Sequence, residues 1–189
     1  EMKIKYLQYP FYHTIIYNVF SKTKLESMIT ELISLTEVYD ADEHHKNLKI
    51  KNNTEPFCID RIYDKDRSKS TILNYTSKHF RLKYNGDLNP FLNYLPLTNQ
   101  DTTFVQKYYN GASYQNHNDF SVLTFLYLMN VEKYNGGQLV FTKYDYMPNL
   151  KHNSCLIFPS YEYHKVNKVI SKTKKAVRYS INRRLYIKG

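Results

Sequence analysis

The sequence predicts an α+β protein that is mainly β: a double-stranded β-helix of the jelly-roll or cupin-like kind, with N-terminal helices packed on one sheet. Three observations predict this fold. From Thr103 onward, short apolar segments alternate with turn residues at the spacing of an antiparallel sandwich or barrel. Residues 122–129 are apolar on both alternating faces, as expected of a strand covered on both sides. Residues 23–35 carry an apolar stripe at helical spacing, which can provide the second cover.

The N-terminal part is expected to hold one strand and one well-marked helix. The apolar, β-branched run Tyr12–Phe20 predicts the strand. The helix is predicted over Thr23–Leu35, where Thr23 and Glu26 match a capping box. Weaker patterns predict a loop over Asp40–Glu55 that includes His44 and His45, a strand over Phe57–Tyr63, a helix over Ser70–Phe80, and a turn with a short helix over Asp87–Leu97. We interpret the two adjacent histidines as surface imidazoles, because neighbouring residues diverge on a strand or helix.

The C-terminal part is expected to consist of strands joined by tight turns, with glycine and asparagine between them. The predicted strands are Phe104–Tyr109, Ser121–Met129, Gln138–Thr142, Cys155–Ser160, Tyr163–Ile170 and Ala176–Ile187.

Composition predicts one globular domain over residues 1–189, with residues 1–100 as a strand-helix support and residues 101–189 as the jelly-roll core. The chain is 42% hydrophobic and has no Pro/Ser-rich linker or internal repeat. Without a signal-peptide pattern or a run of 18 or more apolar residues, we expect a soluble, cytoplasmic protein. Cys58 and Cys155 lie in apolar runs and are expected to be buried, reduced thiols.

The formal charge of +10 has two interpretations. A basic face could attract nucleic acid or an acidic substrate. Alternatively, the lysines, which run from Lys3 to Lys188, are scattered over a solvated surface, and we favour this interpretation.

The stretch His117-Asn118-Asp119 is the most informative motif when it is taken with His164. Residues i and i+2 of an extended strand point to the same side, so His117 and Asp119 are aimed at one point. A second histidine from a distant strand would complete two nitrogens and one oxygen around a metal, with the opposite face open. This ligand set is typical of non-haem Fe(II) oxygenases.

Arg178 suggests a second binding site beside the metal. Arg178 and Ser180 share one face of a predicted strand, and the intervening residues take the other face. An arginine that points into a barrel requires an anionic partner, because a buried, unpaired guanidinium is costly. Its planar fork suits a carboxylate.

Four motifs in this order resemble the 2-oxoglutarate- and Fe(II)-dependent dioxygenases, most closely the prolyl 4-hydroxylase-like branch. Residues 108–119 match Y-x-x-G-x-x-Y-x-x-H-x-D, and residues 136–141 match G-G-x-L-x-F. Residues 155–160 with His164 match the strand that leads to the distal histidine, and residues 178–181 match R-Y-S/A-I. The resemblance covers about the last 85 residues strongly and the N-terminal strand-helix unit weakly.

The resemblance implies site residues and cofactors. His117, Asp119 and His164 would be the catalytic, Fe(II)-binding residues, and Arg178, helped by Ser180, would hold the distal carboxylate of 2-oxoglutarate. Tyr108 would line the cosubstrate pocket and Tyr114 its mouth, with O2 as cosubstrate and ascorbate in a supporting role. Lys174 and Lys175 are the competing candidates for the basic anchor; we prefer Arg178 because Tyr-Ser-Ile follows it.

The implied activity is hydroxylation of a C–H bond, with release of succinate and CO2, on a prolyl residue of a peptide or protein partner. Two alternatives stay open. The pattern Arg178-x-Ser180-x-Asn182-x-Arg184 partly resembles the R-x-N-x-T-x-R of AlkB-type nucleic-acid demethylases, although two of four positions differ. The other alternative is a cupin-like jelly roll that binds a metal or ligand without catalysis. We expect no membrane partner, and the sequence does not indicate the oligomeric state.

Overall fold

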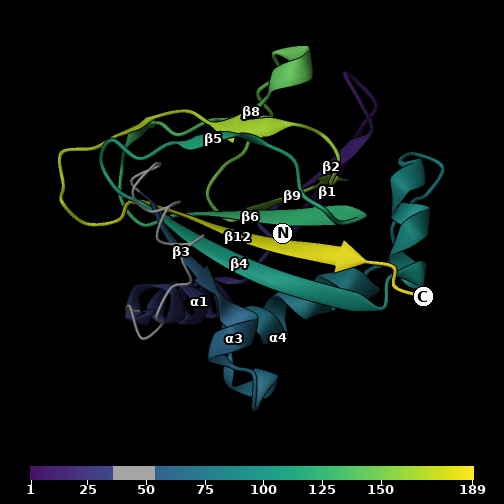
Figure 1. The fold of residues 1–189 in the computed structure, drawn as a ribbon, viewed down its shortest axis with the longest axis horizontal. Helices are drawn as coiled ribbons and strands as arrows, with labels where there is room; N and C mark the ends of the chain where they lie inside the picture. Colours follow the sequence, from purple (N-terminus) through teal and green to yellow (C-terminus); the bar gives the residue numbers. More distant parts are fainter. Residues whose placement is uncertain (36–53) are drawn as a thin grey trace.

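The computed structural model describes residues 1–35 and 54–189, and it confirms the predicted fold class. A seven-stranded antiparallel sheet faces a three-stranded antiparallel sheet, and α1, α3 and α4 lie under the outer face of the larger sheet (Figure 1). A short pair of strands extends one end. His44 and His45 lie outside the described residues.

The larger sheet has the order β1 (Lys3–Leu7), β2 (His13–Tyr17), β9 (Ser154–Pro159), β6 (Leu123–Asn130), β12 (Arg178–Tyr186), β4 (Gln100–Tyr108) and β3 (Thr54–Cys58). The smaller sheet has the order β5 (Tyr114–His117), β10 (His164–Val166) and β8 (Leu139–Phe141), and β7 (Asn135–Gly136) pairs with β11 (Val169–Ile170). The helices are α1 (Lys22–Ser34), α3 (Ile59–Ile62), α4 (Thr71–Ser77) and the 3-10 helices η1 (Arg67–Lys69), η2 (Lys78–Arg81), η3 (Pro90–Leu97) and η4 (Thr142–Tyr144).

Two local predictions are wrong. The capping box is not formed, because α1 begins at Lys22, and the residue before it, Ser21, is extended and makes no side-chain capping bond. Thr23 is therefore already inside the first turn. The strand predicted over Phe57–Tyr63 instead ends at Cys58, where its pairing with β4 stops and α3 begins. Since β3 starts at Thr54, the end of the predicted loop is also strand.

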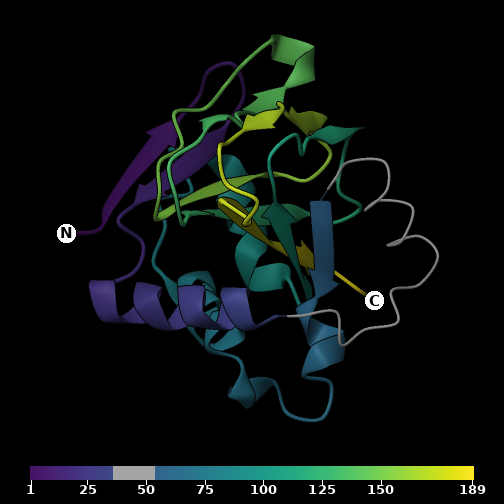
Figure 2. The same cartoon turned by 90° about the vertical axis from the view of Figure 1, so that its left-hand side faces the viewer.

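The larger sheet is buried on both faces, as the apolar pattern of residues 122–129 predicted. One core lies between this sheet and the helices and includes Phe125, Tyr127 and Met129 of β6 together with Met28 and Leu32 of α1. The second core lies between the two sheets and includes Leu126. Figure 2 shows α1 running beneath the strands that it covers. Within the described residues, no helix is long and apolar enough to span a membrane.

The β12 strand sends its two adjacent arginines in opposite directions. Arg183 faces the helices, where it is 1% exposed and donates to the Leu73 carbonyl (3.0 Å) and the Thr76 hydroxyl (2.8 Å). It also pairs with Asp101. Arg184, one residue further, lines the cavity between the sheets. The alternation of strand side chains therefore separates a structural arginine from one that is available to the site.

Adjacent positions on α1 offer a matched test of this packing. Leu32 is fully buried against the sheet, whereas Ile33 is 53% exposed. Leu32→Ala should lower the free energy of unfolding by about 2–5 kcal/mol because it leaves a cavity under the sheet. Ile33→Ala should change it by about 0.5 kcal/mol or less. Urea denaturation of both variants measures the difference; equal losses would contradict this placement of the helix.

Candidate active site

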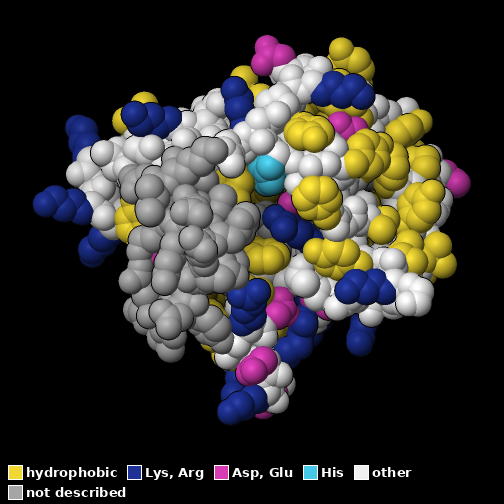
Figure 3. All heavy atoms as spheres, in the orientation of Figure 1, with side chains coloured by type: hydrophobic (Ala, Val, Ile, Leu, Met, Phe, Trp, Pro, Cys, Tyr) yellow, Lys and Arg dark blue, Asp and Glu magenta, His cyan; other side chains and the backbone are white. Residues whose placement is uncertain are grey.

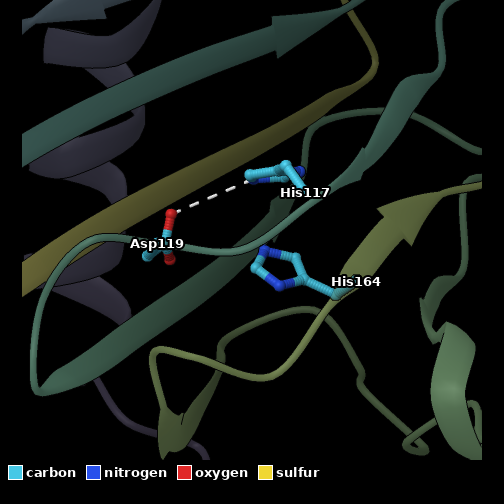
Figure 4. Close-up of side chains that lie close together, drawn as sticks. All are labelled: His117, Asp119 and His164. Carbon is cyan, nitrogen blue, oxygen red and sulfur yellow. Dashed lines mark ion pairs between the residues drawn. The ribbon is translucent and has the colours of Figure 1, made fainter.

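Two strands of the smaller sheet bring the predicted metal ligands together. His117 ends β5 and lies directly opposite His164 on β10 in the antiparallel register. Asp119 follows just beyond β5, where its backbone N–H donates to the Ser160 carbonyl (2.9 Å). One ligand atom from each of the three residues lies within 4.8 Å of the others, and Figure 4 shows the three side chains converging. His117 Nε2 is 3.9 Å from Asp119 Oδ1.

Backbone carbonyls orient both imidazoles. The Nδ1 of His117 lies 3.0 Å from the Gln115 carbonyl, and the Nδ1 of His164 lies 2.9 Å from the Glu162 carbonyl. Each carbonyl can only accept, so each Nδ1 carries the proton in this arrangement. The lone pair of each Nε2 is then free to bind a metal, in the manner of histidine ligands held by a second hydrogen bond.

Burial keeps both imidazoles neutral. It lowers the pKa of His164, and the nearby His117 lowers this pKa further, while Asp119 acts in the opposite direction. Burial is also the largest cause of the lowered pKa of His117. Since only the neutral imidazole binds a metal, the site favours the metal-binding form near neutral pH.

The carboxylate of Asp119 is held by one oxygen and leaves the other toward the histidines. Its Oδ2 accepts a hydrogen bond of 2.7 Å from the Thr124 hydroxyl, which in turn lies 2.9 Å from the Ser160 hydroxyl. Oδ1 faces His117 and lies 2.6 Å from Arg184 Nη2. Two nitrogens and one oxygen could thus hold an iron ion, and this is the donor set that non-haem Fe(II) prefers.

An anion-binding pocket adjoins these residues. A cavity of about 520 Å³ is lined by both histidines and by Tyr108, Tyr114, Arg178 and Ser180. Arg178 is 1% exposed and stacks on the Tyr108 ring at 4.4 Å. Its Nε and Nη1, and the Ser180 hydroxyl, are buried without a hydrogen-bond partner. Such uncompensated donors are costly unless a ligand satisfies them, and the shape and charge of the group suit a carboxylate.

Six of the seven predicted site residues line this cavity, and the seventh, Asp119, lies beside the two histidines at its wall. Tyr114 lies at its partly exposed side, with its ring centroid 4.6 Å from that of His117. The sequence reasoning missed Thr124, because a threonine inside an apolar strand carries no motif of its own. It also missed the contact of Arg184 with Asp119, which only the tertiary structure creates.

The C-terminal part of the chain resembles a known protein family in sequence. A family model described as the 2OG-Fe(II) oxygenase superfamily matches residues 103–186, a segment that carries all three ligands and Arg178. Over this segment, the chain is similar to the 2OG-Fe(II) oxygenase superfamily. This similarity, together with the two-histidine, one-carboxylate group, supports Fe(II) and 2-oxoglutarate as cofactors and a dioxygenase as the general activity.

Solved structures of prolyl hydroxylases share the fold of this chain at low sequence identity. A prolyl hydroxylase from Trichoplax adhaerens, in complex with a hypoxia inducible factor oxygen degradation domain peptide fragment, is 20% identical with a TM-score of 0.66, covering 93% of this chain and 83% of its own. A Pseudomonas putida prolyl-4-hydroxylase is 14% identical with a TM-score of 0.61, covering 94% and 93%. The viral collagen prolyl hydroxylase of Paramecium Bursaria Chlorella virus-1, in a 2OG complex, is 15% identical with a TM-score of 0.56, covering 92% and 94%. No curated protein sequence matches the chain.

The carboxylate ligand can be tested by metal binding alone. Asp119→Ala should weaken the binding of Fe(II), or of Mn(II) as a stable substitute, by more than about 100-fold, because it removes the only anionic ligand. Calorimetric titration measures the affinity. Asp87→Ala, at an exposed position between η2 and η3, is the matched control and should bind metal as the wild type does. Unchanged affinity in Asp119→Ala would exclude this residue as a ligand.

The pH dependence of metal binding tests the neutral imidazoles. Two histidines with the ordinary pKa of 6.5 would each cost about tenfold in affinity at pH 5.5. Because the pKa values of His117 and His164 are lowered, their neutral forms persist below 6.5. Mn(II) affinity should therefore stay nearly constant from pH 7.5 through 6.5 and decline only at more acidic pH. A steep loss centred at 6.5, in protein that circular dichroism shows to be folded, would contradict the prediction.

Proposed function

We propose that the chain is an Fe(II)- and 2-oxoglutarate-dependent hydroxylase of a prolyl residue in a peptide or protein. In this proposal it is one catalytic domain over residues 1–189, with residues 1–100 as the support and residues 101–189 as the catalytic jelly-roll core. The observation that carries the proposal is the position of a two-histidine, one-carboxylate group beside a buried arginine whose Nε and Nη1 have no hydrogen-bond partner and which lines the same cavity as the histidines.

The proposed roles follow from that geometry. His117, Asp119 and His164 hold Fe(II) through Nε2, Oδ1 and Nε2, while their other polar atoms are fixed by Gln115, Thr124 and Glu162. When bound, Fe(II) and 2-oxoglutarate supply the O2-dependent oxidation of a substrate C–H bond, with release of succinate and CO2.

The protein contributes binding, orientation and exclusion of water. Arg178 and Ser180 would hold the distal carboxylate of 2-oxoglutarate, with Tyr108 stacked against the guanidinium. Because Arg178 and Tyr108 are almost fully buried, that ion pair would form away from bulk water and be correspondingly strong. Tyr114, beside His117, would border the substrate at the mouth.

The prolyl assignment is supported by the branch of the family. The motifs at residues 108–119 and 178–181 match the prolyl hydroxylase pattern, and the similar folds reported above are those of prolyl hydroxylases, one of them holding a peptide. On the face shown in Figure 3, Lys and Arg side chains are scattered over both the middle and the edges and do not form a continuous patch, which is consistent with a solvated basic surface.

Replacing the buried arginine tests the cosubstrate anchor. Arg178→Gln should raise the KM for 2-oxoglutarate by roughly 10- to 100-fold, because it removes charge-assisted hydrogen bonds to a carboxylate. Lys174→Gln and Lys175→Gln remove the same charge at exposed positions in the preceding turn and should leave the KM unchanged. Succinate formation at varied 2-oxoglutarate measures all three. If the KM for 2-oxoglutarate rises only in one of the lysine variants, that lysine and not Arg178 binds the cosubstrate carboxylate.

The proposed substrate class is tested by stimulation of turnover. With Fe(II), 2-oxoglutarate and O2, proline-containing peptides should increase succinate formation, and the same peptides with alanine in place of proline should not. Mass spectrometry should find the added oxygen on the prolyl residue. If methylated single-stranded DNA stimulates turnover and peptides do not, the chain is a nucleic-acid demethylase. If no condition yields succinate, the jelly roll binds its ligands without catalysis.

A further inference from the structure

The inner face of β12 carries more polar groups than 2-oxoglutarate requires. Arg178, Ser180, Asn182 and Arg184 occupy alternate positions of this strand, and all four line the cavity. Arg178 is stacked on Tyr108 (4.4 Å), whereas Arg184 is stacked on Phe104 (4.7 Å).

The two arginines stack on residues that are well separated along β4. Phe104 and Tyr108 are four residues apart, which corresponds to roughly 13 Å along the strand. If Arg178 holds the distal carboxylate of 2-oxoglutarate, Arg184, which lies against Phe104 and Asp119, is left for another ligand.

A metal ion at the site would weaken the ion pair of Arg184 with Asp119. Its Nη2 pairs with Asp119 Oδ1, the oxygen that faces His117 and that we assign to iron. An ion at this position and the guanidinium would compete for the same oxygen. Arg184 Nε, Asn182 Oδ1 and Gln106 Oε1 are buried without hydrogen-bond partners and belong to residues that line the cavity.

A charge balance gives the sign of the group that would pair with Arg184. Fe(II) and the dianion of 2-oxoglutarate cancel each other, and Asp119 offsets only one of Arg178 and Arg184. Among the described residues that line the cavity or contact Arg184, one positive charge is therefore left without a counter-charge in the loaded pocket. A partly buried charge of this kind favours an anionic partner.

We propose that Arg184, with Asn182 beside it, binds an acidic side chain of the substrate, so that the hydroxylated peptide carries Asp or Glu next to the reacting residue. This inference rests on the proposed function. A peptide fits better than nucleic acid, because a backbone of phosphates is usually contacted by a row of Lys and Arg. Among the described residues that line the cavity, no lysine is present.

Matched peptides and charge-swapped variants test the inference. Proline peptides that carry Asp, Asn or Lys beside the proline are titrated against the Mn(II)- and 2-oxoglutarate-loaded chain by fluorescence anisotropy, and their turnover is measured with Fe(II). The Asp peptide should bind at least about tenfold more tightly than the Asn peptide, as expected for a charge-assisted hydrogen bond. Arg184→Gln should abolish this preference, Arg184→Lys should keep part of it, and Arg184→Glu should favour the Lys peptide.

Two controls separate recognition of the substrate from a structural role. Arg81→Gln removes the same charge at an exposed position on η2 and should leave the preference intact. The affinities of Arg184→Gln for Mn(II) and 2-oxoglutarate should not fall, since its proposed ligand is the substrate. If instead its metal affinity falls and the preference for Asp persists, Arg184 only positions Asp119 and the inference is wrong.

The remaining outcomes distinguish this inference from the function on which it rests. If Asp, Asn and Lys peptides bind and react equally well, the prolyl hydroxylase assignment stands and the role of Arg184 is wrong. If no peptide binds, the prolyl hydroxylase assignment and the role of Arg184 are both wrong. This holds whether or not single-stranded DNA binds instead.

Discussion

The site depends on one register, in which His164 of β10 lies directly opposite His117 of β5. A slip of one residue would turn one imidazole to the other face of the smaller sheet and separate the ligands. On its other edge β10 pairs with β8, with His164 opposite Phe141, so the strand is held on both sides. The rings of Phe141 and Phe158 pack against His164, and a hydrogen bond from its Nδ1 to the Glu162 carbonyl fixes the imidazole beside Asp119 and His117.

A second constraint is the pleat of β12, which turns one face of the strand to the helix-side core and the other to the cavity. Tyr179, Ile181 and Leu185 face the helices and belong to the core on that side. Arg183 is on the same face, where its Nη1 donates to α4 and its Nη2 pairs with Asp101. The opposite face presents arginines whose donors are left partly unsatisfied. Functional sites commonly depart from full polar satisfaction in this way, and the well-packed helix layer behind the sheet compensates for the cost.

Burial serves the chemistry as well as the fold. It lowers the pKa of both histidines, so the ligands are in their metal-binding form without the help of a metal. The same low-dielectric surroundings strengthen any ion pair that Arg178 makes. The resulting pocket is positively charged, which favours a dianionic cosubstrate and leaves Arg184 to select among substrates.

The sequence by itself determined the jelly-roll class and the doubly buried β6, and it predicted the seven candidate site residues, because strand periodicity and motif order are local properties of the chain. It could not determine that Thr23 would lie inside a helix or that Phe57–Tyr63 would change from strand to helix, since these boundaries depend on where pairing partners end. Only the tertiary structure decided that Thr124 holds Asp119 and that Arg184 reaches its other oxygen. The first contact depends on how the chain turns between β5 and β6, and the second joins that turn to β12, so neither contact has a signature in the sequence.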